Sequence, residues 1–523
     1  MSIPRSLLPP LDTAAHVPRV TRARGNPSAR AGQWDAIFVI AADIAQPRAF
    51  ADLPEPERWR ELHSRAKPRA GSVRSTSLAN SRHTLAVLGY SRADASPFER
   101  LQLAGRMLKE ASARAVDAVA LAALGDRASG AAHVANLEAL LAAAFAHAFA
   151  LPSFRSAREP RKPLREIVLL GGDDVDVRQA SAAARGNNLV RWLTALPPNK
   201  LDARTYRRLI ADIARTNGLS MRFLDESALK RLGAGAFLAV AAANEEPGAG
   251  IVHLRYRPTP GPTRGPGRSK SRRAPDVALV GKGIIFDTGG INLKPHKSML
   301  DMHTDMSGSA VALATLVALA ELKAPFAVDA WLAITENRIG PKGYKPQDIV
   351  HAANGVTIQV IHTDAEGRMA LADTLALAGR TQPKLIIDYA TLTGASVYAL
   401  TERMSSVFTN RPALAGKLVE AGRVSGERVW NFPFDADFDS DLESKVADIV
   451  QCPVDGKGDH ILAARFLSRF VPENVAWAHV DLSSATRNGG LGHINTDITG
   501  FGVRFTLEAL LRQGLLDGLE RPE

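Results

Sequence analysis

Apolar and polar positions alternate at two length scales along the first 187 residues of the chain. Short apolar runs typical of buried strands occupy residues 36–41, 83–88, 116–122 and 166–170. Longer stretches with helical spacing lie at 98–113 and 131–150, and residues 180–194 predict a connecting helix. Strands that alternate with helices in this way are typical of an α/β fold.

The same alternation continues around two polar loops in the second part of the chain. Residues 277–280 read as a short buried strand, and Gly281-Lys282-Gly283 predicts a loop at its carboxyl end. We therefore expect Lys282 and Asp287 at the strand edge, where open α/β sheets place their ligands. The second loop ends at Asp305 and leads into an apolar helix over residues 309–322.

A third polar segment lies between a predicted strand and a predicted helix. Residues 357–361 form a strand pattern that feeds directly into Asp364, and residues 369–377 form the helical pattern that follows. Side chains two residues apart share one face of a strand. If the extended trace continues beyond residue 361, Asp364, Glu366 and Arg368 therefore point to one face.

Seven charged residues stand at glycine-flanked positions inside these otherwise apolar segments. They are Lys282, Asp287, Lys294, Asp305, Asp364, Glu366 and Arg368. Burial of an unpaired charge is very costly, so the cluster needs a strong internal partner. Carboxylates are hard oxygen ligands, and in hydrolytic sites they bridge two cations about 3.5–4 Å apart. The sequence therefore predicts a site for two divalent metal ions.

At these motifs the chain closely resembles the leucyl aminopeptidase family of two-metal exopeptidases. The resemblance rests on VGKGIIFDTGG at 280–290, Lys294-Pro295, Asp305-Met306 and TDAEGR at 363–368. It extends over roughly residues 187–511 and includes PPN at 197–199 and ATLTGA at 390–395. Both the charged residues and the spacings between the motifs agree with the family.

The resemblance implies a set of metal ligands. Lys282, Asp287, Asp305 and Glu366 would bind the tighter metal, and Asp287, Asp364 and Glu366 the looser one, with the main-chain carbonyl of Asp364 contributing. Asp287 and Glu366 would then bridge the two ions. Zinc or manganese is expected, with magnesium or cobalt as alternatives at the looser position. A lysine amine binds metal only when neutral, so the two dications would have to lower the pKa of Lys282.

The resemblance also assigns two catalytic residues that bind no metal. Lys294 would stabilise the oxyanion of the tetrahedral intermediate. Arg368 is too basic to act as a base, and would instead hold a bicarbonate ion that shuttles the proton. Backbone groups of Leu392 and Gly394 would help to seat this anion.

Several positions bear on specificity. Met302 and Thr391 match positions near the substrate side-chain pocket of the family. The chain departs from the family pattern at His362, where Asn is usual, and at His460, which lies in segment 458–464 where small residues are usual. His460 would narrow the pocket. These histidines, together with His296 and His303, read as rim or packing residues, because the implied ligand set is complete without them.

The implied function is hydrolysis of the N-terminal residue of peptides, with a preference for Leu-like residues, by a homohexamer of two trimers. The implied fold is a smaller N-terminal α/β domain joined by a helix to a larger α/β catalytic domain with a central mixed sheet. The expected parts are a flexible tail at 1–33, the N-terminal domain at 34–178, the linker helix at 179–195 and the catalytic domain at 196–523, with a basic insertion at 258–274. A dinucleotide-binding loop at Gly281-x-Gly283 is disfavoured because its third glycine is missing.

Length and composition agree with a globular enzyme. A chain of 523 residues exceeds what one core usually supports, and 46% of its residues are hydrophobic. Its longest apolar runs are too short to span a bilayer, so no membrane association is expected. The first 33 residues lack the apolar core of a secretory signal, although their Arg-rich start leaves an organelle-targeting interpretation open. The single Cys452 excludes an internal disulfide and suits the cytoplasm.

The charge distribution leaves a second function class open. The net charge is +11, and residues 1–187 carry 26 Lys and Arg against 18 Asp and Glu. The Pro- and Gly-rich segment 258–274 is also basic, and such surfaces bind nucleic acid through its phosphates. The alternative is a nucleic-acid-binding regulator built on the enzyme scaffold. A solvated loop explains the same charge more simply, and salt-dependent retention on DNA would distinguish the two.

Overall fold

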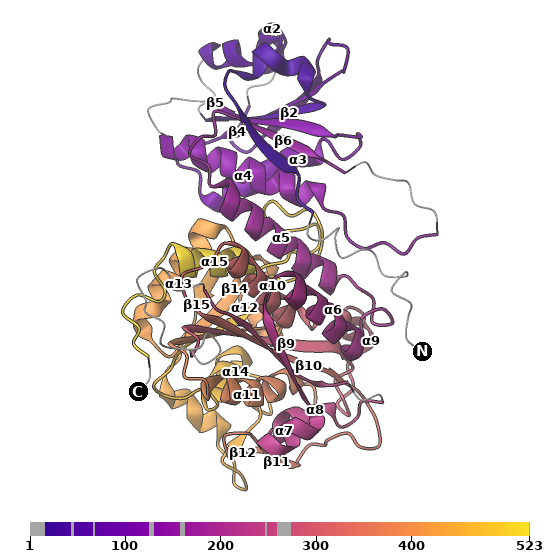
Figure 1. The fold of residues 1–523 in the computed structure, drawn as a ribbon, viewed down its shortest axis with the longest axis vertical. Helices are drawn as coiled ribbons and strands as arrows, with labels where there is room; N and C mark the ends of the chain where they lie inside the picture. Colours follow the sequence, from indigo (N-terminus) through magenta and orange to yellow (C-terminus); the bar gives the residue numbers. More distant parts are fainter. Residues whose placement is uncertain are drawn as a thin grey trace.

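The protein is described by a computed structural model that covers residues 16–42, 47–65, 68–124, 130–156, 163–245, 248–258 and 274–521. A six-stranded sheet and an eight-stranded sheet occupy opposite ends of the elongated molecule, and helix α5 (Val177–Thr194) runs between them (Figure 1). A three-stranded sheet lies beside the larger one. The predicted fold, with a smaller N-terminal α/β part and a larger mixed α/β part, is confirmed.

The N-terminal sheet has the order β1-β6-β5-β2-β4-β3, and only its edge strand β3 runs antiparallel to its neighbour. Its strands are β1 (Arg19–Ala23), β2 (Ala36–Ala42), β3 (Val73–Ser77), β4 (Leu85–Ser91), β5 (Ala118–Leu124) and β6 (Glu166–Leu170). The helices are α2 (Pro56–Arg65), α3 (Pro97–Lys109) and α4 (Gly130–Ala148). Strand β2 is apolar at successive positions because both faces are covered: Phe38 packs in one core and Ile37 in the other. All four strands predicted in this region are present.

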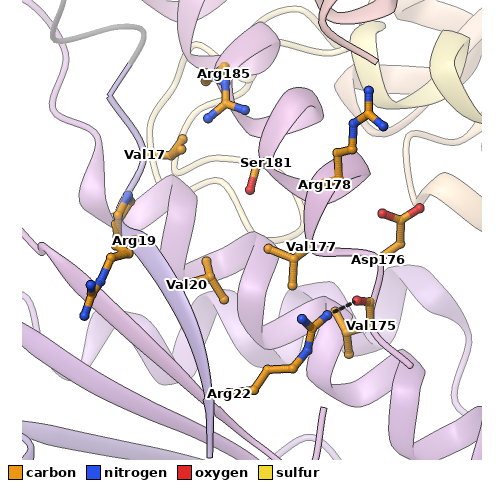
Figure 2. Close-up of a pocket in the computed structure, with 11 residues that line it drawn as sticks. Val17, Arg19, Val20, Arg22, Val175, Asp176, Val177, Arg178, Ser181 and Arg185 are labelled. Atoms are coloured by element: carbon orange, nitrogen blue, oxygen red, sulfur yellow. Dashed lines mark hydrogen bonds between the residues drawn. The ribbon is translucent and has the colours of Figure 1, made fainter. Parts of the chain in front are cut away.

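Strand β1 corrects one prediction, since it lies within residues expected to form a flexible tail. It pairs in parallel with β6, with Arg19 opposite Glu166. Arg22 donates hydrogen bonds to the carbonyls of Gly172 and Val175 at 3.0 and 2.9 Å. The arginines that suggested a solvated tail therefore hold this strand in place. They line a pocket of about 630 Å³ between β1 and α5, away from the charged cluster described below (Figure 2).

The central sheet has the order β15-β14-β17-β13-β9-β10-β8-β7 and is mixed. Its four middle strands are parallel, whereas β14, β8 and β7 each run antiparallel to the neighbour nearer the centre. The strands are β7 (Ser220–Asp225), β8 (Gly250–Tyr256), β9 (Val277–Asp287), β10 (Val328–Asn337), β13 (Leu385–Ala390), β14 (Ser405–Thr409), β15 (Val429–Asn431) and β17 (Ala476–Asp481). Helices α10 (Ser307–Glu321) and α11 (Glu366–Gly379) belong to the two different cores, one on each face of the sheet.

The remaining elements surround this sheet. The helices are α6 (Ala203–Thr216), α7 (Glu226–Leu232), α8 (Gly235–Ala241), α9 (His296–Met299), α12 (Gly394–Leu400), α13 (Pro412–Ser425), α14 (Asp459–Ser468) and α15 (Val503–Leu511). The 3-10 helices are η2 (Pro27–Gln33), η3 (Pro47–Asp52), η4 (Met302–Thr304), η5 (Thr401–Arg403) and η6 (Ala436–Leu442). The three-stranded sheet contains β11 (Ile349–His351), β12 (Thr357–Gln359) and β16 (Ile449–Val450). None of the helices in the described ranges is long and apolar enough to cross a membrane.

The loop predicted at Gly281-Lys282-Gly283 is wrong, because β9 continues through these residues to Asp287. A Cβ atom at Gly281 would lie 2.5 Å from the carbonyl oxygen of Gly308. At Gly283 it would lie 2.7 Å from the carbonyl oxygen of Ala333. These glycines therefore allow α10 and β10 to approach the strand closely, and Lys282 projects from the interior of the sheet.

The segment before α11 also differs from its prediction. Strand β12 ends at Gln359, two residues before its predicted end, and belongs to the small sheet, so four residues separate it from Asp364. Helix α11 begins at Glu366, earlier than the predicted residue 369. The extended trace therefore does not continue to Arg368, and Glu366 and Arg368 are placed by helical geometry.

Candidate metal centre

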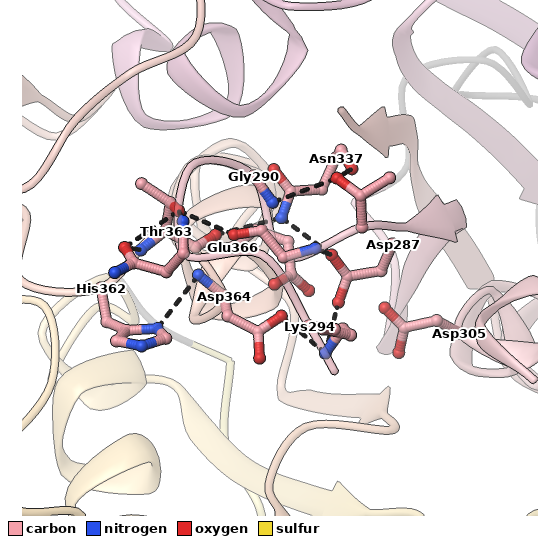
Figure 3. Close-up of polar contacts among 12 residues, drawn as sticks. Asp287, Gly290, Lys294, Asp305, Asn337, His362, Thr363, Asp364 and Glu366 are labelled. Atoms are coloured by element: carbon pink, nitrogen blue, oxygen red, sulfur yellow. Dashed lines mark hydrogen bonds and ion pairs between the residues drawn. The ribbon is translucent and has the colours of Figure 1, made fainter. Parts of the chain in front are cut away.

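Four carboxylates from three segments meet at the ends of β9 and α11 (Figure 3). Asp287 is the last residue of β9, Asp305 follows η4, Asp364 lies just before α11, and Glu366 is the first residue of α11. Asp287, Asp364 and Glu366 each offer an oxygen, and these oxygens all lie within 4.8 Å of one another. Asp287, Asp305 and Glu366 are buried. Such a concentration of buried negative charge requires cations.

Two lysines contact these carboxylates. The Lys282 Nζ atom lies 2.8 Å from Asp305 Oδ1 and 2.9 Å from Glu366 Oε1. The Lys294 Nζ atom lies 2.9 Å from Asp287 Oδ2 and 2.6 Å from Asp364 Oδ1. The structure thus brings together the five residues that the resemblance implies as ligands, together with Lys294.

Burial and mutual repulsion perturb this cluster. Burial first, and then the charge of Asp287, raises the pKa of Glu366 to about 8, against the opposing pull of Lys282. Burial raises the pKa of Asp305 to about 6, although Lys282 opposes the shift. Burial alone would lower the pKa of the Lys282 amine, but the neighbouring carboxylates outweigh it and raise that pKa. Two ammonium groups therefore leave four carboxylates incompletely neutralised.

The residues fit divalent metal ions. Within the described ranges, Asp305 Oδ2 and Glu366 Oε2 are buried without a hydrogen-bond partner. An ionised carboxylate oxygen is rarely buried in this state, because its lone pairs need a donor or a cation. Divalent cations such as Mg²⁺ and Mn²⁺ prefer carboxylate oxygens, so the donor set agrees with the predicted metal site.

A residue outside the sequence motifs, Asn337, supports Asp287. Asn337 Nδ2 donates to Asp287 Oδ1 at 2.8 Å and to the carbonyl of Thr363 at 3.0 Å. The backbone N–H of Gly289 donates to the same Asp287 oxygen at 2.8 Å. Asn337 is fully buried at the end of β10, opposite Asp287 in the sheet register. The sequence signal that could have identified Asn337 is an amide residue at the end of an apolar strand.

Arg368 lies beside the cluster but contacts other residues. Its Nη2 atom is 2.8 and 2.9 Å from the two carboxylate oxygens of Asp459, the first residue of α14. Its Nη1 atom donates to the carbonyl of Gln451 at 3.2 Å. The side chain is only 2% exposed. Sequence reasoning did not anticipate Asp459 as the partner of Arg368.

Some of the predicted substrate and anion positions contact the cluster directly. Thr391 donates through Oγ1 to Asp305 Oδ1 at 2.7 Å, and its carbonyl accepts from Lys282 at 2.9 Å. The N–H of Leu392 donates to Asp481 Oδ1 at 3.0 Å. Gly394 begins α12. Met302 begins η4, and its carbonyl accepts from the N–H of Asp305 at 3.3 Å.

These contacts do not fit the bicarbonate ion that the resemblance places on Arg368. Asp459 and the carbonyl of Gln451 already accept from the terminal nitrogens of the guanidinium. The Leu392 N–H, which was expected to help seat the anion, is taken by Asp481. A second anion beside Asp459 would also be repelled by its carboxylate. The bicarbonate prediction is therefore not retained.

The histidines lie around the cluster. The N–H of Asp364 donates to His362 Nδ1 at 3.3 Å. The His460 ring packs edge-on against Phe432, with 4.6 Å between the ring centroids. His296 is exposed and His303 is half-buried. Most of the basic segment 258–274, which raised the nucleic-acid alternative, lies outside the described residues.

Comparison with known proteins identifies related chains. The family model described as "Cytosol aminopeptidase family, catalytic domain" matches residues 188–507. A probable cytosol aminopeptidase of Synechococcus sp. (strain CC9605) is 34% identical over 484 residues, which cover 91% of this chain and 94% of that protein. One from Parasynechococcus marenigrum (strain WH8102) is 38% identical over 359 residues, covering 67% of this chain and 71% of the relative.

Solved structures agree in fold. A mutant of tomato leucine aminopeptidase superposes with a TM-score of 0.80 at 28% identity, covering 95% of this chain and 97% of that one. The bottromycin maturation enzyme BotP, in complex with Mn, gives a TM-score of 0.76 at 29% identity, covering 92% of this chain and 100% of that one.

Proposed function

The chain belongs to the cytosol aminopeptidase family and is therefore an aminopeptidase, and we propose that it releases N-terminal residues from peptides with two divalent metal ions in the cluster. One observation carries the proposal. Asp287, Asp364 and Glu366 converge within 4.8 Å of one another, next to further buried carboxylate oxygens that lack partners in the described structure. Such a donor set is suited to hard cations rather than to an organic cofactor.

The proposed ligands are Lys282, Asp287, Asp305, Asp364 and Glu366, with Asp287 and Glu366 shared between the two ions. When bound, the ions supply Lewis acidity and lower the pKa of a coordinated water. Lys282 would bind as the neutral amine, and the structure supports its place because its Nζ already contacts Asp305 and Glu366. Gly367 leaves room for it, since a Cβ there would lie 2.5 Å from Lys282 Cε.

Lys294 is proposed to stabilise the negative charge that develops on the substrate carbonyl oxygen. Its side chain is 14% exposed, and its ammonium contacts Asp287 and Asp364, of which Asp364 is the more exposed at 26%. A preorganised cation in a water-poor site stabilises a developing oxyanion strongly. Met302 and Thr391 are proposed to border the pocket for the N-terminal side chain, for which Leu-like residues are the proposed preference.

Further proposals concern the metals, the assembly and the compartment. Manganese or zinc is proposed, and the manganese complex of the related BotP supports the former. A homohexamer is proposed, supported by exposed apolar side chains such as Leu300 at 65% and Tyr398 at 91% exposure, which suit a subunit interface. A cytoplasmic location is proposed from the names of the relatives and from the single cysteine.

The test is hydrolysis of a panel of aminoacyl amides by metal-depleted protein after zinc, manganese, cobalt or magnesium is added back. We expect no turnover without metal, restored turnover with manganese or zinc, and the highest kcat/KM on leucyl-type amides. N-acetylated substrates should be inert, because an aminopeptidase requires a free α-amine.

A matched control uses an exposed acid from the same loop as Asp305. Asp301→Ala should retain full activity and two bound metals, because Asp301 is exposed and outside the cluster. Asp305→Ala should lose both. Activity that survives exhaustive chelation, or equal behaviour of the two variants, would overturn the proposal.

A further inference from the structure

The buried Arg368 guanidinium already has a counter-ion from its own chain. Its Nη2 atom contacts both oxygens of Asp459, and its Nη1 atom donates to the carbonyl of Gln451. Its Nε atom is buried and has no hydrogen-bond partner in the described part of the chain. The side chain as a whole is only 2% exposed, so little of the guanidinium faces solvent, where a dissolved anion would approach.

The pair lies next to the proposed catalytic centre. Arg368 stands two residues after Glu366 in the first turn of α11. Burial opposes the charged form of Arg368, but Asp459, with Glu366 as a weaker contributor, raises its pKa. The Asp459 side chain is 23% exposed, whereas that of Arg368 is 2% exposed. The carboxylate is therefore the member of the pair that reaches the solvent-accessible side.

The local backbone fixes the place of Asp459. Here α14 begins at Asp459 itself, preceded by Gly458 with a φ of 61°. This left-handed residue turns the chain directly into the helix. The Asp459 carboxylate thus fills the position beside Arg368 as a fixed part of the fold.

We propose that Asp459 is the built-in anion of Arg368, so that hydrolysis by this protein requires no dissolved bicarbonate. A carboxylate and a bicarbonate ion present the same pair of oxygens to a guanidinium. Because Asp459 belongs to the chain, its binding costs no association entropy and its effective concentration is fixed. Asp459 holds Arg368 in position and also takes the proton-shuttling place that the resemblance gives to bicarbonate. The proposal rests on the aminopeptidase activity proposed above.

The test compares wild type, Asp459→Ala, Asp459→Asn and the control Asp455→Ala in buffers freed of carbon dioxide, with and without added bicarbonate at constant ionic strength. Asp455 is a matched control because it lies in the same loop and pairs with Lys457 on the exposed surface. We measure leucyl amide hydrolysis by the metal-loaded, full-length proteins. In parallel we measure their melting temperatures with and without bicarbonate.

Wild type and Asp455→Ala should be equally fast with or without bicarbonate. Asp459→Ala should be slower by about 10²-fold, the loss expected when a catalytic group is displaced by about 1 Å. Bicarbonate should restore at least about a tenth of wild-type turnover to Asp459→Ala, because the truncated side chain opens the guanidinium to an external anion. Asp459→Asn should be slow without rescue, since its amide still fills the site.

The melting temperatures test the anion site without relying on catalysis. Bicarbonate should raise the melting temperature of Asp459→Ala and leave that of wild type unchanged. An equal response of wild type and Asp459→Ala to bicarbonate, in rate or in melting temperature, would overturn the proposal, as would full activity of Asp459→Ala without the anion. If wild type hydrolysed no aminoacyl amide, the proposed function would be refuted. The melting temperatures would still test whether Asp459 occupies the anion position beside Arg368.

Discussion

Replacing Lys294 separates metal binding from turnover. In the structure its Nζ atom lies 2.9 Å from Asp287 Oδ2 and 2.6 Å from Asp364 Oδ1. At an effective dielectric constant of about 20, each pair has a gross Coulomb energy of about 6 kcal/mol, before the cost of desolvation. In the metal-free protein Lys294 therefore neutralises two carboxylates that are proposed to bind metal once it is present.

This geometry predicts two different effects of Lys294→Ala. In the metal-loaded enzyme kcat should fall by about 10²–10³, or about 2.7–4 kcal/mol, because a cation aimed at transition-state charge is lost. In the metal-free protein the free energy of unfolding should fall by about 3–5 kcal/mol, the cost of removing one partner of a buried ion pair. Bound metal should reduce this difference, since the ions then neutralise Asp287 and Asp364.

The assay combines steady-state kinetics on a leucyl amide with metal analysis and denaturant unfolding, each with and without metal. Lys297→Ala is the matched control, because Lys297 is an exposed lysine in α9, three residues further along the chain. It should behave as wild type in all three measurements. The reasoning is refuted if Lys294→Ala keeps wild-type kcat with two metals bound. It is also refuted if its loss of stability is the same with and without metal.

Four further predictions concern the cluster and its surface. Asp287→Ala or Glu366→Ala should abolish hydrolysis and lower the metal content, because each removes a carboxylate proposed to bridge both ions; normal turnover with two metals would contradict the bridging assignment. Metal binding to metal-free protein should release more protons below pH 6 than above pH 8 in calorimetry, since burial raises the pKa of Asp305 to about 6 and that of Glu366 to about 8. Because the folded metal-free state holds these protons more tightly than the unfolded chain, its free energy of unfolding should fall as pH rises toward 8, and a rise would contradict the shifts. Light scattering should give the mass of a hexamer, and a stable monomer at micromolar concentration would remove the proposed assembly.

The sequence predicted the parts of the fold that depend on local pattern. Strands β2, β4, β5 and β6 and helices α4 and α5 appear within a few residues of their predicted ranges. Their apolar runs are long and are bounded by polar turns, so period and length decide their type. Strand β1 was missed because three of the five residues in its sequence, RVTRA, are arginine or threonine, and because its pairing with β6 spans 147 residues.

The glycines around Lys282 show why a local signal can mislead. Gly281-Lys282-Gly283 has the composition of a loop. In the structure a Cβ at Gly281 would also lie 2.5 Å from the Cα of Ser309. The glycine is therefore needed for close packing and does not mark a turn of the chain. The close contact between β9 and α10 requires these glycines, and this contact cannot be predicted from the sequence of either segment alone.

Only part of the candidate site could be predicted from local sequence. Residues 363–368 carry Asp364, Glu366 and Arg368 within six positions, so a short motif was sufficient to group them before the fold was known. The partner of Arg368 stands 91 residues away at Asp459, outside the motifs that carried the resemblance. A motif specifies which groups perform the chemistry, but their charge balance depends on residues that only the folded chain brings together. The proposed role of Asp459 implies that a change at such a distant partner alters the requirement for an external anion while every residue of the motif stays the same.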